Sequence, residues 1–205
     1  ILDGLNYVRA HPAILALILL SIVPFMFGMP LNTLLPAFNE DVLLGGPDDL
    51  GLLLSAMGMG AILGSLMLAA SGDLKHKGTW LVVSCFGWGV ATVLFGMAPN
   101  LWTAVAVLAL VGWLSSWNMS LNRGLLQVQV ERRMRGRIMS IDMMSHGLMP
   151  LGVLPVSMIA DAYDISTSLI VSGVVFIILI GVMVLVSTPV RKLDSMLLDA
   201  RRMNQ

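Results

Sequence analysis

Long apolar stretches separated by short charged clusters set the pattern of this chain. Runs without Asp, Glu, Lys or Arg cover residues 12–39, 50–72, 78–122, 143–160 and 165–190. A helix needs about 20 apolar residues to cross the hydrocarbon core of a bilayer, so four runs provide one crossing each. The run 78–122 must turn once, and Ala98-Pro99-Asn100 is the turn signal inside it. The pattern predicts six transmembrane helices, at residues 13–35, 50–71, 79–97, 101–126, 138–160 and 166–188.

The composition agrees with an all-α membrane protein and excludes several other classes. Hydrophobic residues make up 57% of the 205 residues and charged residues only 12%, whereas soluble domains average about 25% charged. A net charge of zero leaves no basic surface for nucleic acid. The single cysteine, Cys85, excludes an intrachain disulfide and a cysteine-based zinc site. We therefore expect no metal and no cofactor, and we expect the lipid bilayer to be a partner.

All twelve Lys and Arg residues fall on one side of the predicted topology. They precede the first helix, join the second to the third and the fourth to the fifth, lie near the same end of the fourth, or follow the sixth. The opposite connections have no Lys or Arg and carry Glu40, Asp41, Asp48, Asp49, Asp161 and Asp164. Since basic loops stay in the cytoplasm, both termini are predicted to be cytoplasmic in a multi-pass protein of the inner or plasma membrane.

Three regions follow from this topology: a cytoplasmic linker over 1–12, the six-helix bundle over 13–188, and a cytoplasmic tail over 189–205. Ile1 is not an initiator methionine and no pattern of a cleavable signal peptide precedes the first helix, so we expect the chain to begin within a linker; the alternative is a complete protein with a processed start. In the tail, Val190, Leu193 and Leu197 share one helical face. This predicts an amphipathic helix on the inner leaflet, with a disordered solvated tail as the alternative.

Small residues recur at every fourth position in two of the predicted helices. They are Ala56, Gly60 and Gly64 in the second helix and Gly112, Ser116, Ser120 and Gly124 in the fourth. Such faces let another helix backbone approach closely. They are consistent with static packing and also with helices that slide against each other, and the sequence leaves both open.

The first helix contains Pro24 and Pro30, with Pro36 at its outer end. It should be kinked, because each proline removes a backbone N–H and clashes with the preceding turn. Asn32 and Thr33 lie beside the predicted break. Broken transporter helices present freed backbone groups to a cavity, although purely structural kinks are as common. We therefore take Asn32 and Thr33 as candidate substrate-cavity residues.

The fourth helix carries the other candidate cavity residues, Trp113, Trp117, Asn118 and Asn122. Polar side chains within a membrane usually face the interior of a bundle. The third and sixth helices have almost no polar residues and are expected to face lipid, so the first, second, fourth and fifth helices should surround any central pathway.

Charged residues inside the predicted helices form a second set of candidates. Arg123 and Asp142 lie at similar depths inside the cytoplasmic ends of the fourth and fifth helices. A charge in the bilayer is costly unless it is paired, so we predict that they pair; the alternative is that Arg123 reaches the interface alone. His146 lies four residues after Asp142 on the same face and could titrate in the physiological range, although a hydrogen-bonded structural role is commoner.

A short internal repeat relates the two halves of the chain. Leu63-Gly64 is followed nine residues after the glycine by Asp73, and Leu151-Gly152 is followed by Asp161 at the same spacing. The two aspartates lie on opposite sides of the predicted membrane. Equivalent positions on opposite faces indicate an inverted three-plus-three repeat, a feature of transporters.

Four stretches carry motifs in a characteristic order. Gly72–Gly78 is similar to a shortened Gly-x-x-x-Asp-Arg-x-Gly-Arg loop, with Lys75 and Lys77 in place of the usual arginines. Gln127–Ser140 has a Gln before a short acidic-basic loop that ends Arg-Gly-Arg, and Gly147–Gly152 continues that pattern. Gly4–Pro12 has the pattern of a linker into a seventh helix. In these motifs the chain resembles the carboxyl-terminal six helices of the major facilitator superfamily, in its enterobactin-exporter-like and multidrug-efflux branch.

The resemblance implies transport and not enzymatic activity. It implies proton-coupled efflux of a siderophore or drug-like small molecule by alternating access, with this chain as half of a twelve-helix carrier. The missing partner is then the amino-terminal half or a second half-transporter. Ion pairs that close an inner gate would use charged residues of the cytoplasmic side: Asp73, Lys75, Lys77, Arg135 and Arg137. The alternative is that the basic residues among them only set the topology.

Two other functions fit six transmembrane helices. A non-transporting scaffold or assembly subunit would need neither broken helices nor buried amides, so the prolines and asparagines count mildly against it. A membrane enzyme would need a nucleophile with its base, or a metal cluster, and no motif supports either.

Overall fold

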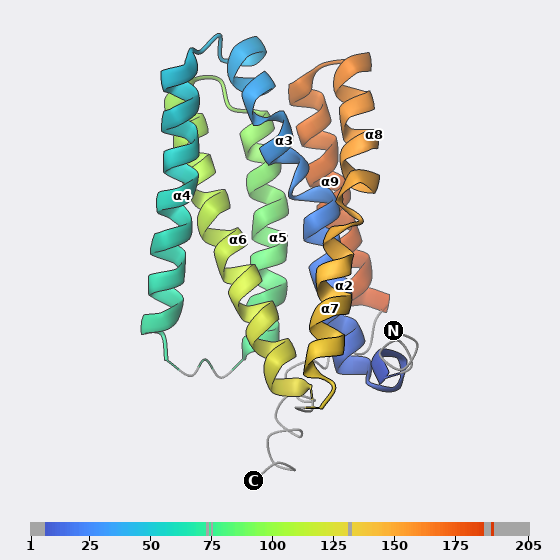
Figure 1. Ribbon diagram of the computed structural model, residues 1–205. Helices are drawn as coiled ribbons and strands as arrows, with labels where there is room; N and C mark the ends of the chain where they lie inside the picture. The colour runs from blue at the N-terminus through green and yellow to red at the C-terminus, as the bar shows by residue number, and fades with distance from the viewer. Residues whose placement is uncertain (1–6, 73, 75, 131–132, 187–189, 191–205) are drawn as a thin grey trace.

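Each predicted crossing is occupied by one helix or by a broken helix in the computed structural model, which describes residues 7–72, 74, 76–130, 133–186 and 190 (Figure 1). Six segments are long and apolar enough to cross a membrane. The elements, in chain order, are α2 (Pro12–Phe27), α3 (Pro30–Ala37), the π-helix η1 (Phe38–Val42), α4 (Pro47–Ala70), α5 (Lys77–Gly96), α6 (Leu101–Gln129), α7 (Arg135–His146), α8 (Met149–Ala162) and α9 (Ile165–Val186). The described residues contain no strand. The predicted fold class and number of crossings are confirmed, and the protein is a multi-pass membrane protein.

Local sequence signals explain where the helices begin. Pro47 opens α4 at a position where its missing N–H costs nothing, and the Gly46 N–H donates to Asp49 Oδ2 over 2.9 Å. At the predicted turn before α6, Asn100 is the N-cap, and its Oδ1 accepts from the Thr103 N–H over 3.0 Å. These caps satisfy donors that the first turn of a helix leaves unpaired.

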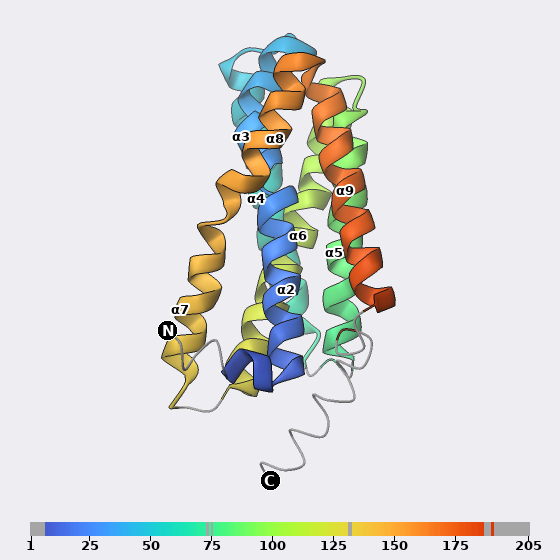
Figure 2. The same cartoon turned by 90° about the vertical axis from the view of Figure 1, so that its right-hand side faces the viewer.

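The helices lie in layers (Figure 2). Helices α5 and α9 pack together on one side of the bundle, and α2 and α6 lie in the middle. On the flanks, α4 packs mainly against α6, and α7 packs mainly against α2. The connections at one end of the bundle carry Asp41, Asp161 and Asp164, and we call this the acidic end; the opposite end, where α2 begins and α9 ends, we call the basic end.

The pattern of helix pairs agrees with the predicted three-plus-three repeat. The second crossing packs against the fourth, the fifth packs against the first, and the third packs against the sixth. The two glycines that the repeat aligns make equivalent contacts. Gly64 lies against the backbone and ring of Trp113 in α6, and Gly152 lies against the Met26 backbone in α2. The short repeat Leu63-Gly64 and Leu151-Gly152 therefore corresponds to a real equivalence in packing.

The predicted small-residue faces do bring α4 and α6 close together. Gly60 lies against the backbone of Ala109, and Gly112 lies against the backbone of Met57, so a side chain at either glycine would overlap the other helix. Nearer the basic end, the hydroxyls of Ser65 and Ser116 are 2.8 Å apart. Gly124, by contrast, has no neighbouring atoms within 4 Å that a methyl group would meet.

Two predictions about the crossings are wrong. The fifth crossing is not one helix over 138–160: it breaks between α7 and α8 at Gly147-Leu148, just before Pro150. The third crossing, α5, does not simply face lipid. Cys85 is 0% exposed and Trp88 only 2%, because one face of α5 packs against α2, α6 and α9 and only the other face is exposed.

Candidate functional site

The break between α2 and α3 lies at Gly28-Met29, as the prolines predicted. Pro24 lies inside α2, and its carbonyl accepts from both the Gly28 N–H at 2.8 Å and the Met29 N–H at 3.2 Å. Pro30 has no N–H to donate to the carbonyl four residues before it, that of Met26. The regular pattern of backbone hydrogen bonds therefore stops in the middle of the crossing, where no water is available to pair with the freed backbone groups.

Asn32 and Thr33 follow this break directly. Thr33 is exposed, and Asn32 is half-buried, with its amide nitrogen 3.3 Å from the sulfur of Met29. The Asn32 Oδ1 atom is buried, and no described group donates a hydrogen bond to it. An unused acceptor beside a helix break is a suitable group for binding the donor of a ligand.

Asn118 and Asn122 connect helices instead of lining an open surface. Both are 3% exposed. The Asn118 amide donates to Cys85 Sγ in α5 over 2.8 Å, and the Asn122 amide donates to the Leu17 carbonyl in α2 over 2.9 Å. These hydrogen bonds join α6 to α5 and to α2, and such interhelical bonds are a common role of amide side chains in membrane helices.

Trp113 and Trp117 lie on a different side of α6, against α4. The Trp117 indole N–H donates to the Gly64 carbonyl over 2.8 Å, and the two indole rings are 5.4 Å apart. Trp80 of α5 meets the ring of Trp117 edge-on at 5.7 Å. The structure therefore does not bring the two tryptophans and the two asparagines to one cavity wall.

The charged candidates gather at the basic end. Arg135 and Arg137 are exposed in the first turn of α7, Arg123 is exposed on α6, and Lys77 begins α5. Asp142, in contrast, is 3% exposed. An exposed guanidinium and a buried carboxylate are not the buried pair that we expected, so the pairing of Arg123 with Asp142 stays a prediction. Asp73, Lys75 and the side chain of His146 lie outside the described residues.

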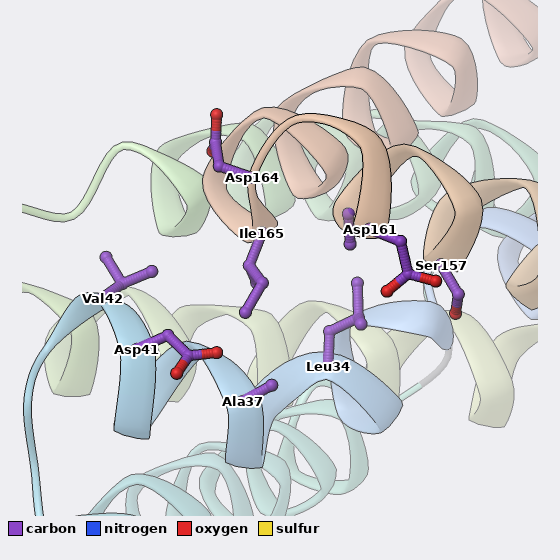
Figure 3. Close-up of a pocket in the computed structure, with 9 residues that line it drawn as sticks. Leu34, Ala37, Asp41, Val42, Ser157, Asp161, Asp164 and Ile165 are labelled. Carbon is purple, nitrogen blue, oxygen red and sulfur yellow. The ribbon is translucent and has the colours of Figure 1, made fainter.

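A cavity that sequence reasoning missed lies at the acidic end, between α3–η1 and the α8–α9 hairpin (Figure 3). Its volume is about 460 Å³, and its polar walls include Asp41, Ser157, Asp161 and Asp164. In Figure 3 the carboxylates of Asp41 and Asp161 point into the cavity, whereas that of Asp164 points away. The acidic loops were visible in the sequence, but which of them meet depends on how the helices pack.

Asp164 has a structural role at this cavity. It precedes α9, and its carboxylate accepts from the Thr167 N–H at 2.6 Å and from the Thr167 hydroxyl at 2.7 Å. These hydrogen bonds, the backbone one first, lower the pKa of Asp164 below its usual value. Among the described residues no three His, Cys, Asp or Glu side chains are grouped so that they could hold a metal ion.

Comparison with known proteins places this arrangement in a family. The chain is 28% identical over 173 residues to the staphyloferrin A transporter of Staphylococcus aureus, covering 83% of this chain and 43% of the relative. It is 24% identical over 195 residues to macrolide efflux protein A of Streptococcus pyogenes, covering 94% and 48%. It is 32% identical over 141 residues to the enterobactin exporter of Shigella boydii, covering 67% and 33%.

The chain thus spans less than half the length of these curated relatives. A family model described as transmembrane secretion effector matches residues 1–205. Since the match covers every residue and the relatives are named as a transporter, an efflux protein and an exporter, the chain belongs to this transporter family of the major facilitator superfamily.

Proposed function

We propose that this chain is the carboxyl-terminal half of a carrier that exports a small molecule across the cell membrane. The observation that carries the proposal is the family match over the whole chain, joined to a length less than half that of the relatives. In such carriers the substrate site lies between two halves, and alternating access moves one half against the other. Six helices supply one wall of that site.

The substrate wall would be formed by the broken α2–α3 helix. Asn32 offers an unused acceptor next to the break, and Thr33 adds an exposed hydroxyl. Both lie in a crossing that is largely apolar, so they would select substrates by a few hydrogen bonds on a hydrophobic surface. The relatives are named for siderophores and macrolides, and a siderophore or drug-like molecule is the substrate class we propose here.

The missing half would cover the flanks of the bundle. On α4, Met59, Ile62 and Leu66 are more than 60% exposed, and on α7–α8 Met143 and Met158 are similarly exposed. In the membrane these faces meet either lipid or another helix. Methionine-rich faces adapt easily to a partner, which suits contacts that change during a transport cycle.

The basic end would face the cytoplasm, which places both termini inside the cell. Arg123, Arg135 and Arg137 would then stand at the inner mouth, where pairing with carboxylates, Asp142 or those of the other half, would close it. Coupling to protons would need a carboxylate or His146 to titrate during the cycle.

Efflux from cells tests the proposal. The chain is produced with its amino-terminal half in a bacterial strain that lacks its own macrolide and siderophore exporters, and accumulation of a macrolide and secretion of enterobactin are measured. We expect export of at least one of the two, loss of export with a protonophore, and reduced export by Asn32→Leu. Trp102→Phe is the control, because Trp102 is 72% exposed at the acidic end of α6. Normal membrane insertion without export of either compound would favour the scaffold alternative instead.

A further inference from the structure

Another hollow of the bundle lies between α5 and α6, which pack side by side and run in opposite directions (Figure 1). We call it the α5–α6 groove. Its volume is about 630 Å³, larger than that of the acidic-end cavity. All the residues that line it are apolar, and three of them on α5, Val83, Phe86 and Val90, are each at least 40% exposed. Such a surface offers water no hydrogen-bonding partner, so the groove stays dry.

A glycine among larger side chains makes this hollow. Gly87 lies opposite Leu114 of α6, and a methyl group at Gly87 would lie 3.1 Å from a Leu114 methyl carbon. Val83 and Val90 follow on the same face of α5, about one turn before and after Gly87. The missing side chain at position 87 therefore leaves a depression between neighbours that project from the helix.

The depth of the groove places it in the hydrocarbon core of the bilayer. Helix α5 has 20 residues and is about 30 Å long, which equals the thickness of that core. The groove extends along α5 from Val82 to Ala91, which is about 14 Å, and it stops about 8 Å from either end of the helix. At this depth the surroundings consist of acyl chains or of protein.

Two indole rings close the groove at the basic end. Trp80 lies three residues before Val83 on α5, and Trp117 lies three residues after Leu114 on α6, so both are about one turn nearer the basic end. Their rings meet edge-on with centroids 5.7 Å apart, and they thus connect the two helices.

Toward the acidic end the surface of the groove continues. The next turn of α5 presents Leu94, which is 46% exposed, and the next turn of α6 presents the exposed, small Ala106. A long molecule can therefore enter from the acidic end and is stopped by the indoles at the other.

The dimensions fit a chain of methylene groups better than a helix. Dividing the volume by the length gives a cross-section of about 45 Å². A helix with its side chains is at least about 10 Å wide, which corresponds to about 80 Å². The missing half of the carrier is also proposed to cover α4 and α7–α8, whereas α5 lies in the layer that it forms with α9.

We propose that the α5–α6 groove binds one acyl chain of a phospholipid from the leaflet at the acidic end, with the end of the chain against Trp80 and Trp117. An unfilled groove would leave its walls without van der Waals partners, and the chain supplies them. From Gly96 to the level of Val82 the chain extends about 21 Å, more than the roughly 15 Å of one leaflet, so it crosses the midplane. This binding site goes beyond the proposed function and does not require transport.

Phospholipids with a photoreactive diazirine at one position of an acyl chain test the site. The complete protein is placed in nanodiscs that contain such a lipid, illuminated and digested, and the labelled residues are identified by mass spectrometry. A diazirine at the chain end should label α5 at Val83 and Phe86, and one near the head group should label it near Leu94. Labelling at these residues should exceed that of Ile178, which is 55% exposed on α9. A chain from the opposite leaflet would reverse the order of depths.

Substitutions show whether the groove itself holds the chain. Gly87→Leu fills the hollow, so labelling of Val83 and Phe86 by the chain-end diazirine should fall to the level of Ile178. Gly181→Leu is the matched control, because a side chain at this glycine of α9 would also enter open space but lies outside the groove. Val90→Phe narrows the groove from another position and should cause the same loss, which guards against a folding defect of Gly87→Leu.

Three results would each overturn the proposal: a reversed order of depths, equal labelling of α5 and α9, or labelling that survives both Gly87→Leu and Val90→Phe. Efflux is measured separately. A labelled groove in a protein that exports nothing would retain the lipid site and remove the proposed function, and export without preferential labelling would do the opposite.

Discussion

The close approach of α4 and α6 makes a sharp prediction about two glycines of the same helix. Gly112 and Gly124 both lie within α6, and both belong to the small-residue face seen in the sequence. A methyl group at Gly112 would overlap the Met57 carbonyl oxygen and would lie 2.9 Å from the Met57 carbonyl carbon, whereas at Gly124 it would meet nothing within 4 Å. The same substitution, glycine to alanine, should therefore leave the protein less stable at Gly112 than at Gly124.

The magnitudes follow from two opposing terms. Alanine favours a helix interior over glycine by about 1 kcal/mol, and this gain applies at both positions. At Gly112 ordinary contact begins at 3.4 Å, and the Met57 carbonyl oxygen would be nearer to the methyl group than the carbonyl carbon at 2.9 Å, so α4 must retreat by more than 0.5 Å. Overpacking of this kind costs about 1–3 kcal/mol. We expect Gly124→Ala to be neutral or stabilising, and Gly112→Ala to be less stable than Gly124→Ala by about 1–3 kcal/mol.

Reversible unfolding in mixed detergent micelles, followed by circular dichroism, measures this difference. Comparison of the two variants cancels the shared helix-propensity term, so the remainder reports the contact between the helices. Equal stability of Gly112→Ala and Gly124→Ala would refute the argument that backbone contact holds α4 to α6. A cost at Gly124 would show that this part of α6 is covered by another surface.

Three further outcomes are expected. Asn122→Leu should lower the free energy of unfolding by about 1 kcal/mol, because it deletes the hydrogen bond to the Leu17 carbonyl. Ser120→Ala, on the exposed side of the same helix, should leave the free energy of unfolding unchanged, and unfolding in micelles measures both variants. Cys85 should not react with maleimide in the folded protein and should react fully after denaturation, as mass spectrometry would detect; rapid native labelling would contradict its burial. The pKa of Asp164 is lowered in the folded protein, so its ionised carboxylate stabilises the fold above the pKa of the unfolded state. This contribution is lost as pH falls through the pKa of the folded state. Thermal midpoints below about pH 4 should therefore drop more for the native protein than for Asp164→Asn.

The order of apolar and charged residues was sufficient to determine the number of crossings, their approximate limits and the separation of acidic from basic ends. The physical reason is that the hydrocarbon core excludes charge over a fixed thickness, so whether a segment crosses the membrane depends on its own length and charge. The kink at Pro24 and Pro30 was equally visible, because a missing N–H acts locally. The repeat of Gly64 and Gly152 was also legible, and packing against equivalent helices explains it.

The direction in which each side chain points was decided only by the tertiary structure. In lipid both the inside and the outside of a bundle are apolar, so a helix such as α5 carries little pattern to say which face turns inward. The third helix was expected to face lipid, yet its Cys85 lies in the core. Trp117 and Asn118 are neighbours in sequence, yet Trp117 contacts α4 and Asn118 contacts α5. The acidic-end cavity joins Asp41 to Asp161, 120 residues apart, because α3–η1 and α8 pass close to each other only in the folded bundle.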